Sequence, residues 1–410
     1  MSLNETDPVI AELIRKEQRR QETTLELIAS ENHVSAAVME AAGTVLTNKY
    51  AEGYPGARYY GGCEFYDQIE NLAIDRAKQL FNCRFANVQP HSGANANLAA
   101  FMAMMKPGDS FISLNLASGG HLSHGMKLNA SAQFYKPDHY ELDPKTETID
   151  FNSVRAKAKE IKPKAILCGY SAYPRVIDFA KFREIADEVG ALLMADIAHY
   201  AGLIAAGLYP SPVGIADFVT STTHKTLRGP RGGIILGQAK DERMLNSGIF
   251  PVLQGGPLMH VIAAKAVAFK EAMGKDFRAY QQQVLVNAGV MARTLSTRGL
   301  RIVSGHTDCH MFLVDLQSKQ VTGKDAEAAL GRANITVNKN LVPNDPQKAM
   351  VTSGVRLGSP AITTRGFKEH ETERVAHGIA DVVEAPNDER VIARVKAGML
   401  ALCRKFPVYG

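Results

Sequence analysis

Lys225 is the residue whose surroundings point most directly to covalent chemistry. It follows the apolar residues 218–220 and ends the segment TSTTHK (220–225), with hydroxyl groups and His224 before it and glycines after it. Most lysines lie at the surface, so an exposed loop lysine is the simplest interpretation. A lysine at the end of a buried strand instead carries a desolvated amine that can form a Schiff base with a carbonyl compound. This segment alone does not decide between the two.

Asp196 strengthens the second interpretation. It ends the apolar run ALLMA (191–195) and precedes Lys225 by 29 residues. A carboxylate at the end of an inner strand is costly unless it pairs with a cation. The protonated ring nitrogen of pyridoxal phosphate is such a cation, and its pairing with an aspartate makes the ring an electron sink. A helix N-cap or a structural ion pair is the ordinary role of an isolated aspartate.

Three further segments carry groups that suit the same cofactor and an amino acid. The turn HSGANAN (91–97) precedes a helical pattern, and Ser92, Gly93 and Ala94 can offer backbone N–H groups to an anion there. In GGHLSHG (119–125), His121 follows two glycines and could lie flat on an aromatic ring, although a hydrogen-bonded loop histidine has the same pattern. Arg356, in GVRLGSPA, could hold a carboxylate with two hydrogen bonds.

Alternating strands and helices must position these residues. Helical patterns cover 67–81, 179–189 and 257–273, and short apolar runs suggest strands at 86–88, 111–114, 165–168, 191–195, 218–220 and 233–236. Such alternation predicts βαβ units and a mainly parallel sheet. Ligands of these sheets gather at the carboxyl ends of the strands, where the polar residues accumulate.

The two ends of the chain have a different character. Residues 7–27 show an amphipathic helix whose apolar face needs a partner. After about residue 276, helical patterns surround an expected strand pair, 311–314 with 335–337, and the last helix covers 391–405. We therefore expect an N-terminal helical arm (1–25), a large domain (26–275) and a small α+β domain (276–410).

Composition excludes several classes of protein. The chain has 410 residues, 45% of them hydrophobic and 22% charged, with a net charge of +5. These values are typical of globular proteins and exclude a disordered or fibrous chain. The basic residues are scattered, so the charge does not indicate nucleic acid. The polar N-terminus does not predict a signal peptide, and charged residues within the apolar segment 191–210 argue against a membrane span.

The five cysteines are dispersed and form no C-x-x-C pair. This pattern predicts buried thiols in a reducing compartment, with no disulfide framework and no metal site. We expect a cytoplasmic protein.

Together these segments closely resemble the serine hydroxymethyltransferase family. The resemblance covers nearly the whole chain, from LELIASEN (25–32), expected as a helix, to the terminal FPVYG. It rests on NKYAEGYPGARYYGG, QPHSGANAN, NLASGGHLSHG, ADIAHYAGL, TTHKTLRGPRGG, QGGPLMH, NITVNKNLVPND and VTSGVRLGSPAIT. It implies an α/β, fold-type I pyridoxal-phosphate enzyme with a mainly parallel seven-stranded sheet and a smaller C-terminal α+β domain. It also implies a homodimer with shared active sites, or a dimer of such dimers.

The resemblance assigns roles to individual residues. Lys225 would hold the cofactor as an internal aldimine, Asp196 would bind the ring nitrogen, and His121 would stack on the ring. The phosphate would be held by Ser92, Gly93 and Ala94, together with Gly256 of the partner subunit. Ser171 and His199 would hydrogen-bond the cofactor near its 3′-oxygen, and Thr222 and His224 would flank the lysine as catalytic residues.

Substrate and folate contacts follow from the same resemblance. Arg356 and Ser30 would bind the substrate carboxylate, and Glu52 would act as general acid and base on the serine hydroxyl. The neighbouring subunit would supply Tyr50, Glu52 and Tyr60, which explains a tyrosine-rich loop without another evident purpose. Tetrahydrofolate would contact Glu52, Tyr59, Leu116, Gly120, Leu122 and Asn340.

The implied reaction is the reversible transfer of the hydroxymethyl carbon of L-serine to tetrahydrofolate, giving glycine and 5,10-methylenetetrahydrofolate for one-carbon metabolism and glycine biosynthesis. Some positions depart from the family pattern: Ala94, Asn95, Ser118, and Met350 where a folate-wall phenylalanine is expected. They keep open a folate-independent aldolase acting on β-hydroxy amino acids, or a transferase for α-methylserine. A catalytically silent scaffold or RNA-binding protein is the third hypothesis, and only the net charge suggests it.

Overall fold

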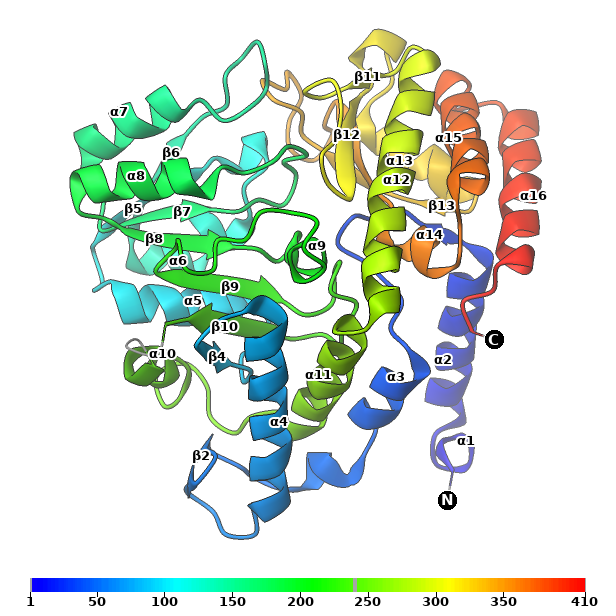
Figure 1. Ribbon diagram of the computed structural model, residues 1–410. Helices are drawn as coiled ribbons and strands as arrows, with labels where there is room; N and C mark the ends of the chain where they lie inside the picture. Colours follow the sequence, from blue (N-terminus) through cyan, green and yellow to red (C-terminus); the bar gives the residue numbers. More distant parts are fainter. Residues whose placement is uncertain (1, 239–241, 410) are drawn as a thin grey trace. The chain divides into compact units, whose positions relative to one another are not determined.

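The computed structural model describes residues 2–238 and 242–409, which form two compact units (Figure 1). Unit 1 contains the chain up to His33 and from Gln283 onward, and unit 2 is Val34–Gln282. The domain limits predicted after residues 25 and 275 fall eight and seven residues before these divisions. The N-terminal helical arm, which we expected as a separate element, is part of unit 1.

A seven-stranded sheet forms the centre of unit 2, with the strand order β4-β10-β9-β8-β7-β5-β6. Only β10 runs antiparallel to its neighbours, so the predicted mainly parallel sheet is confirmed. Strand β6, which begins at Lys136, is not among the strands expected from the apolar runs. The strands are β4 (Phe85–Asn87), β5 (Ser110–Leu114), β6 (Lys136–Tyr140), β7 (Ala165–Cys168), β8 (Leu192–Asp196), β9 (Phe218–Thr222) and β10 (Gly233–Gly237).

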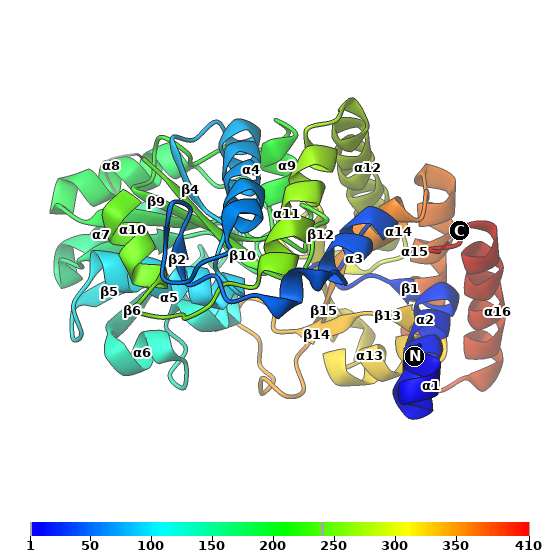
Figure 2. The same cartoon turned by 90° about the horizontal axis from the view of Figure 1, so that it is seen from below.

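Helices cover both faces of this sheet, as Figure 2 shows for α5 and α6 on one side and α4, α8 and α11 on the other. The core between α5, α10 and the sheet contains Phe101, Phe111, Met194, Phe218 and Ile235. The helices of unit 2 are α3 (Ala36–Ala42), α4 (Glu64–Phe81), α5 (Gly93–Met104), α6 (Ala130–Phe134), α7 (Phe151–Ile161), α8 (Phe179–Val189), α9 (Ala201–Ala205), α10 (Glu242–Ile249) and α11 (Met259–Ala272). Short 3₁₀ turns η1 (Val45–Asn48), η2 (Leu116–Ser118) and η3 (Leu122–His124), and a small hairpin of β2 (Gly53–Tyr54) and β3 (Ala57–Arg58), complete it.

Local sequence accounts for the limits of these helices. At the start of α8, the Asp178 carboxylate accepts the backbone N–H of Lys181, and Gly190 ends the helix in the left-handed region. The predicted helices at 67–81, 179–189 and 257–273 correspond to α4, α8 and α11. The helical periodicity is therefore a reliable guide within unit 2.

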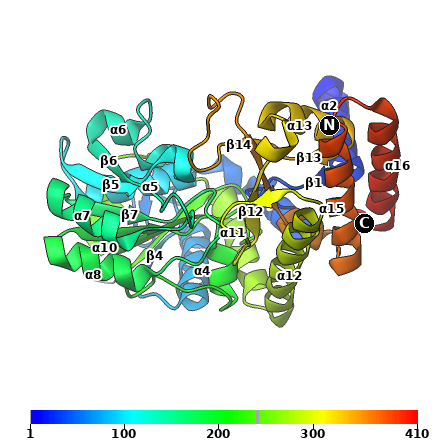
Figure 3. The same ribbon diagram turned by 90° about the horizontal axis from the view of Figure 1, so that it is seen from above.

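Unit 1 contains a four-stranded antiparallel sheet, in the order β11-β12-β15-β14, and a separate parallel pair of β1 and β13. Figure 3 shows β12, β14, β13 and β1 among the helices of this unit. Its strands are β1 (Leu25–Glu26), β11 (Arg301–Ile302), β12 (Met311–Asp315), β13 (Ile335–Thr336), β14 (Asn338–Asn340) and β15 (Gly354–Gly358). Its helices are α1 (Leu3–Thr6), α2 (Pro8–Thr23), α13 (Gly323–Arg332), α14 (Pro360–Thr364), α15 (Glu369–Glu384) and α16 (Glu389–Lys405), with η5 (Gln317–Lys319). Helix α12 (Lys275–Thr297) contains the boundary between the units.

Two predictions for this unit are wrong. The segments 311–314 and 335–337 are both strands but do not pair, because β12 lies between β11 and β15 while β13 pairs with β1. Residues 25–32 begin with strand β1 and contain no helix. Leu25 and Leu27 are fully buried in the core of unit 1, and β1 bonds to β13 from far along the chain, which outweighs the helical pattern.

The N- and C-terminal helices of unit 1, α2 and α16, pack together (Figure 1). Arg365, which is buried, joins their C-terminal ends. Its guanidinium donates to the carbonyls of Gln21, Glu22, Cys403 and Phe406 at 2.9–3.1 Å. A cation at helix C-termini satisfies otherwise unpaired carbonyls and complements the helix dipole. The arm is thereby fixed directly before the segment that carries Ser30.

Candidate active site

A pocket of about 330 Å³ lies in unit 2, where β7, β8 and β9 end and α5 begins. It brings together ten of the predicted site residues: Ser92, Gly93, Ala94, His121, Ser171, Asp196, His199, Thr222, His224 and Lys225. The prediction had not included seven further lining residues: His91, Asn97, His124, Tyr170, Ala198, Arg231 and Gly232. Its size is that of a small-molecule site.

Asp196 is held as a buried carboxylate at the end of β8. Oδ2 accepts hydrogen bonds from Asn97 Nδ2 at 2.8 Å and His124 Nε2 at 3.0 Å, and Oδ1 accepts the Ala198 backbone N–H at 3.0 Å. Burial by itself would raise the pKa of Asp196, but the hydrogen bonds from His124 and Asn97 and the nearby His121 hold it well below its usual range. The site therefore presents a negative charge at this point.

Asn97 connects Asp196 with the neighbouring strand and loop. Its amide donates to Ser123 Oγ at 2.8 Å as well as to Asp196, and its carbonyl accepts from the Thr220 hydroxyl at 2.6 Å. The hydroxyl oxygen of Ser123 lies 2.7 Å from His121 Nδ1, and the backbone N–H of Ser123 donates to the same nitrogen. Because His121 Nδ1 accepts, the ring proton belongs on Nε2. One buried amide thus orients the carboxylate of Asp196 directly and the imidazole of His121 through Ser123.

The start of α5, residues 92–94, is the expected anion site and is called the anion cradle below. Ser92 is the N-cap, and its hydroxyl oxygen accepts the N–H of Asn95 at 3.2 Å. A Cβ on Gly93 would lie 2.6 Å from Thr222 Cγ2, so only glycine lets this turn approach β9 so closely. Ser92, Gly93 and Ala94 line the pocket at the first turn of this helix, where unpaired backbone N–H groups favour an anion.

Lys225 and His224 lie on the turn that follows β9. Lys225 is 8% exposed, so the interpretation as an exposed surface lysine is wrong. Burial, with the charges of Arg231 and Lys225, lowers the pKa of His224 to about 3. His224 therefore stays neutral. Within the described chain, His224 Nδ1 and His91 Nε2 are buried without a hydrogen-bond partner.

Comparison with known proteins accounts for this arrangement. The family model described as serine hydroxymethyltransferase matches residues 3–379. The chain belongs to the serine hydroxymethyltransferase family. Proteins named serine hydroxymethyltransferase are similar over the whole chain: 61% identical in Nitrosomonas eutropha and 62% in Thiobacillus denitrificans, each covering 100% of this chain and 99% of the relative. A protein named serine hydroxymethyltransferase 1 from Pseudomonas fluorescens is 60% identical with the same coverage.

Serine hydroxymethyltransferases are fold-type I enzymes that hold pyridoxal 5′-phosphate and use tetrahydrofolate as co-substrate. The pocket fits the cofactor. It has a permanent carboxylate for a ring N–H, a helix N-terminus for a phosphate, and a buried amine for the carbonyl carbon. Three lining histidine nitrogens, His91 Nε2, His124 Nδ1 and His224 Nδ1, are buried without a hydrogen-bond partner among the residues that the structure describes, and polar groups of a ligand can supply partners for them.

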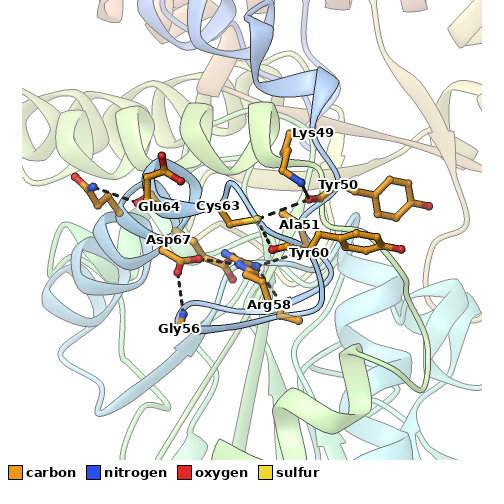
Figure 4. A network of polar contacts seen from close by, with 12 residues as sticks. Lys49, Tyr50, Ala51, Gly56, Arg58, Tyr60, Cys63, Glu64 and Asp67 are labelled. Atoms are coloured by element: carbon orange, nitrogen blue, oxygen red, sulfur yellow. Dashed lines mark hydrogen bonds and ion pairs between the residues drawn. The ribbon is translucent and has the colours of Figure 1, made fainter.

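The predicted residues of the tyrosine-rich loop are not in this pocket. Arg58 anchors the loop by ion pairs with Asp67 at 2.8 Å and Glu70 at 2.6 Å, and by hydrogen bonds to the Ala51 and Gly53 carbonyls. Figure 4 shows the rings of Tyr50 and Tyr60 projecting in the same direction from this anchored loop. Arg58 therefore holds the loop in place, and none of the loop residues lines the pocket of its own chain.

Gly256 and Glu52 belong to the same cluster as Tyr50. A Cβ on Gly256 would lie 3.1 Å from Tyr50 Cε1, and one on Gly255 would lie 3.2 Å from Glu52 Oε1. Tyr50, Tyr59 and Tyr60 are 59%, 73% and 47% exposed. All the residues expected to serve a neighbouring subunit thus form one surface of unit 2.

The other predicted contacts are divided between the units. In unit 2, Leu116 and Leu122 are exposed on the turns before and after His121, and Gly120 is buried between them. In unit 1, Arg356 on β15 donates to Ser30 Oγ at 3.3 Å and to Asn338 Oδ1 at 3.2 Å, so the predicted pair Arg356 and Ser30 does come together. Asn340 ends β14 of the same sheet.

No helix in residues 2–238 and 242–409 has the length and apolar character needed to cross a membrane. Over the same residues, no cluster of three or more histidine, cysteine or acidic side chains could hold a metal ion.

Proposed function

We propose that this chain performs the serine hydroxymethyltransferase reaction with the residues of this pocket. L-serine and tetrahydrofolate are converted reversibly to glycine and 5,10-methylenetetrahydrofolate. The observation that carries the proposal is the combination of a buried amine on Lys225, the permanent carboxylate of Asp196 and a helix N-terminus around one pocket. Full-length identity of about 60% to proteins of that name supports it.

Each group has a distinct task in this proposal. Asp196 keeps the proton on the ring nitrogen, His121 stacks on the ring, and the N–H groups of residues 92–94 bind the phosphate. Pyridoxal 5′-phosphate, when bound, withdraws electrons from the bonds at the Cα of the amino acid. The buried amine of Lys225 would hold the cofactor at its carbonyl carbon. His224, kept neutral by burial, adds no positive charge beside the cofactor.

A further set of residues acts on the substrates in the proposal. Arg356, oriented by Ser30 and Asn338, holds the carboxylate of the amino acid by charge-assisted hydrogen bonds. Glu52 moves the proton of the serine hydroxyl, the task of a positioned general acid and base. Tyr59, Leu116, Gly120, Leu122 and Asn340 form the folate contacts.

We further propose a homodimer in which Tyr50, Glu52, Tyr60 and Gly256 complete the site of the neighbouring subunit. Exposed tyrosines on a firmly anchored loop support this, because monomers rarely leave large aromatic groups in one exposed cluster. A second exposed apolar surface, Val9, Ile10, Leu13 and Ile14 on α2, also suits a partner chain. The five cysteines are free and buried, which favours a reducing compartment such as the cytoplasm.

The reaction itself is tested by comparing amino-acid substrates with and without tetrahydrofolate. We expect glycine formation from L-serine to require tetrahydrofolate and to exceed cleavage of allo-threonine. Negligible serine turnover, with folate-independent cleavage of allo-threonine, would instead identify an aldolase. Rapid turnover of α-methylserine in preference to serine would identify the related transferase.

Shared sites are tested by mixing two inactive variants, Lys225→Ala and Glu52→Gln. Each homodimer lacks a required group at both sites. If Glu52 serves the other subunit, a mixed dimer contains one site with both groups intact. Random exchange of subunits should then restore about a quarter of the wild-type turnover, because half of the dimers are mixed and each has one active site of two.

The control is the same mixing of Lys225→Ala with Asp196→Asn, two residues of one pocket. Every site in that mixture lacks one of the two groups, so we expect no recovery. Recovery in the control alone, or none in the first mixture after verified subunit exchange, contradicts the proposed sharing.

A further inference from the structure

Lys265 is a fully buried lysine whose role neither the pocket nor the sequence motifs explain. It lies on α11 and is 1% exposed. Its Nζ donates to three backbone carbonyls, those of Val88 at 2.7 Å, Pro90 at 3.0 Å and Gly233 at 2.9 Å. Burial of an ammonium group is costly unless its hydrogen bonds are made, so this geometry indicates a specific function.

The three carbonyls belong to the backbone that carries the anion cradle. Val88 and Pro90 connect β4 with the cap Ser92 of α5, and Gly233 begins β10. Pro90 O also accepts the N–H of Gly233 at 2.9 Å. A Cβ on Gly233 would lie 2.3 Å from Ser92 O, so the two segments are in close contact. Lys265 therefore joins the chain before the cradle to the strand that supports it.

The same lysine reaches the backbone beside Lys225. A Cβ on Gly232, a pocket residue, would lie 2.4 Å from Lys265 Cε. The carbonyl of Gly232 accepts the N–H of Thr223, two residues before Lys225. Lys265 thus lies directly behind the wall of the pocket.

The geometry suits the charged form of the side chain. Burial lowers the pKa of Lys265 to about 7, and the charge of Glu70 opposes this. Three carbonyl acceptors favour the ammonium, since a neutral amine has only two protons and would direct its lone pair at the third oxygen. The positive charge of Lys265 contributes to the lowered pKa of both His91 and His224, which line the pocket.

We propose that Lys265 is a positioning residue for the phosphate end of the cofactor. It holds the backbone of residues 88–90 so that the N–H groups of α5 are in place before binding, and its ammonium form adds a positive charge behind them. The inference rests on the proposed function and adds to it a residue that does not touch the cofactor. It concerns phosphate recognition alone, so it differs from a general structural role.

The decisive experiment measures the dissociation constants of pyridoxal 5′-phosphate and of pyridoxal, which lacks the phosphate, for the apoenzyme. In Lys265→Met we expect the constant for pyridoxal 5′-phosphate to rise about tenfold or more, because the charge behind the helix N-terminus and its hydrogen bonds to the supporting carbonyls are lost, while that for pyridoxal changes little. Lys270→Met is the matched control, because Lys270 lies on the same helix but is exposed. It should leave both constants unchanged.

A general loss of structure is distinguished by the ratio of the two constants. Equal weakening of both ligands, or no weakening, would overturn the inference. Normal binding of pyridoxal 5′-phosphate by the wild type, together with turnover of serine, would leave the proposed function intact in either case. Failure of the wild type to bind the cofactor would instead refute the proposed function.

Two further measurements do not depend on the folding of Lys265→Met. Lys265→Gln has no charge but retains two donors, and we expect the same loss of preference for the phosphorylated ligand. In the wild-type apoenzyme, hydrogen exchange of the Gly233 amide, which bonds to Pro90 O, should already be slow. Fast exchange there that slows only when the cofactor binds would show that Lys265 does not preorganise the cradle, and would overturn the inference.

Discussion

Replacing Lys225 by alanine should abolish the visible absorbance of covalently held cofactor and lower folate-dependent turnover of serine about a thousandfold or more. The amine of Lys225 is the buried nucleophile in the pocket proposed to hold the cofactor carbon, and alanine leaves nothing to replace it. Absorbance spectra of the purified variant with added pyridoxal 5′-phosphate and a glycine-formation assay measure both effects.

A matched control for this variant is Lys159→Ala on α7. Lys159 has a side chain that is 60% exposed and pairs with Glu188 at the surface. Such a pair contributes little to stability, so this variant should retain the wild-type spectrum and turnover. Wild-type turnover in Lys225→Ala would refute the assignment of Lys225.

The exchange Asp196→Asn should lower turnover by about a thousandfold while leaving the fold intact, an effect of the size seen when a buried catalytic carboxylate is neutralised. Asparagine has the same shape but cannot hold the proton on a ring nitrogen by charge. Asn97 and His124 both donate hydrogen bonds to the carboxylate of the wild type. In the variant they meet an amide instead. Turnover and the dissociation constant of the cofactor are the measurements.

The pH dependence gives a second test of Asp196. Because the folded pKa lies below the ordinary value, the carboxylate stabilises the folded protein fully above that ordinary value, near 4. The contribution is lost only as the pH falls through the lower, folded pKa. Asp196→Asn should therefore remove cofactor affinity equally at pH 6 and pH 8. Asp187→Asn, at an exposed ion pair with Arg183, is the control and should behave as the wild type. A pH-dependent loss between these values would contradict the assignment.

Residues that act through their own segment could be found from sequence. Lys225 and Asp196 each end an apolar run, and Ser92 precedes a helical pattern, so local pattern predicts both the strand end and the polar group beyond it. Parallel strands place their carboxyl ends at one edge, which brings these segments together without further information. The ten predicted lining residues of the pocket follow from this rule and from the family resemblance.

Residues that act through distant contacts could not be found from sequence. Asn97 bonds to Asp196 across 99 positions of the chain, and Lys265 bonds to Val88 across 177. In sequence, Asn97 is one polar residue of a helix and Lys265 one lysine in a largely apolar helix. The same limit explains residues 25–26, which form a strand because β13 pairs with them.

Sequence by itself thus determined the α/β fold class and the residues expected at the strand ends, because periodicity and end groups are local properties, and the family resemblance supplied the cofactor. Only the tertiary structure decided how those groups are held: Asn97 and His124 keep Asp196 charged, Arg58 anchors the tyrosine loop, and Lys265 ties the cradle to β10. The physical reason is that burial and hydrogen-bond partners depend on which segments meet, and these partners lie far apart along the chain.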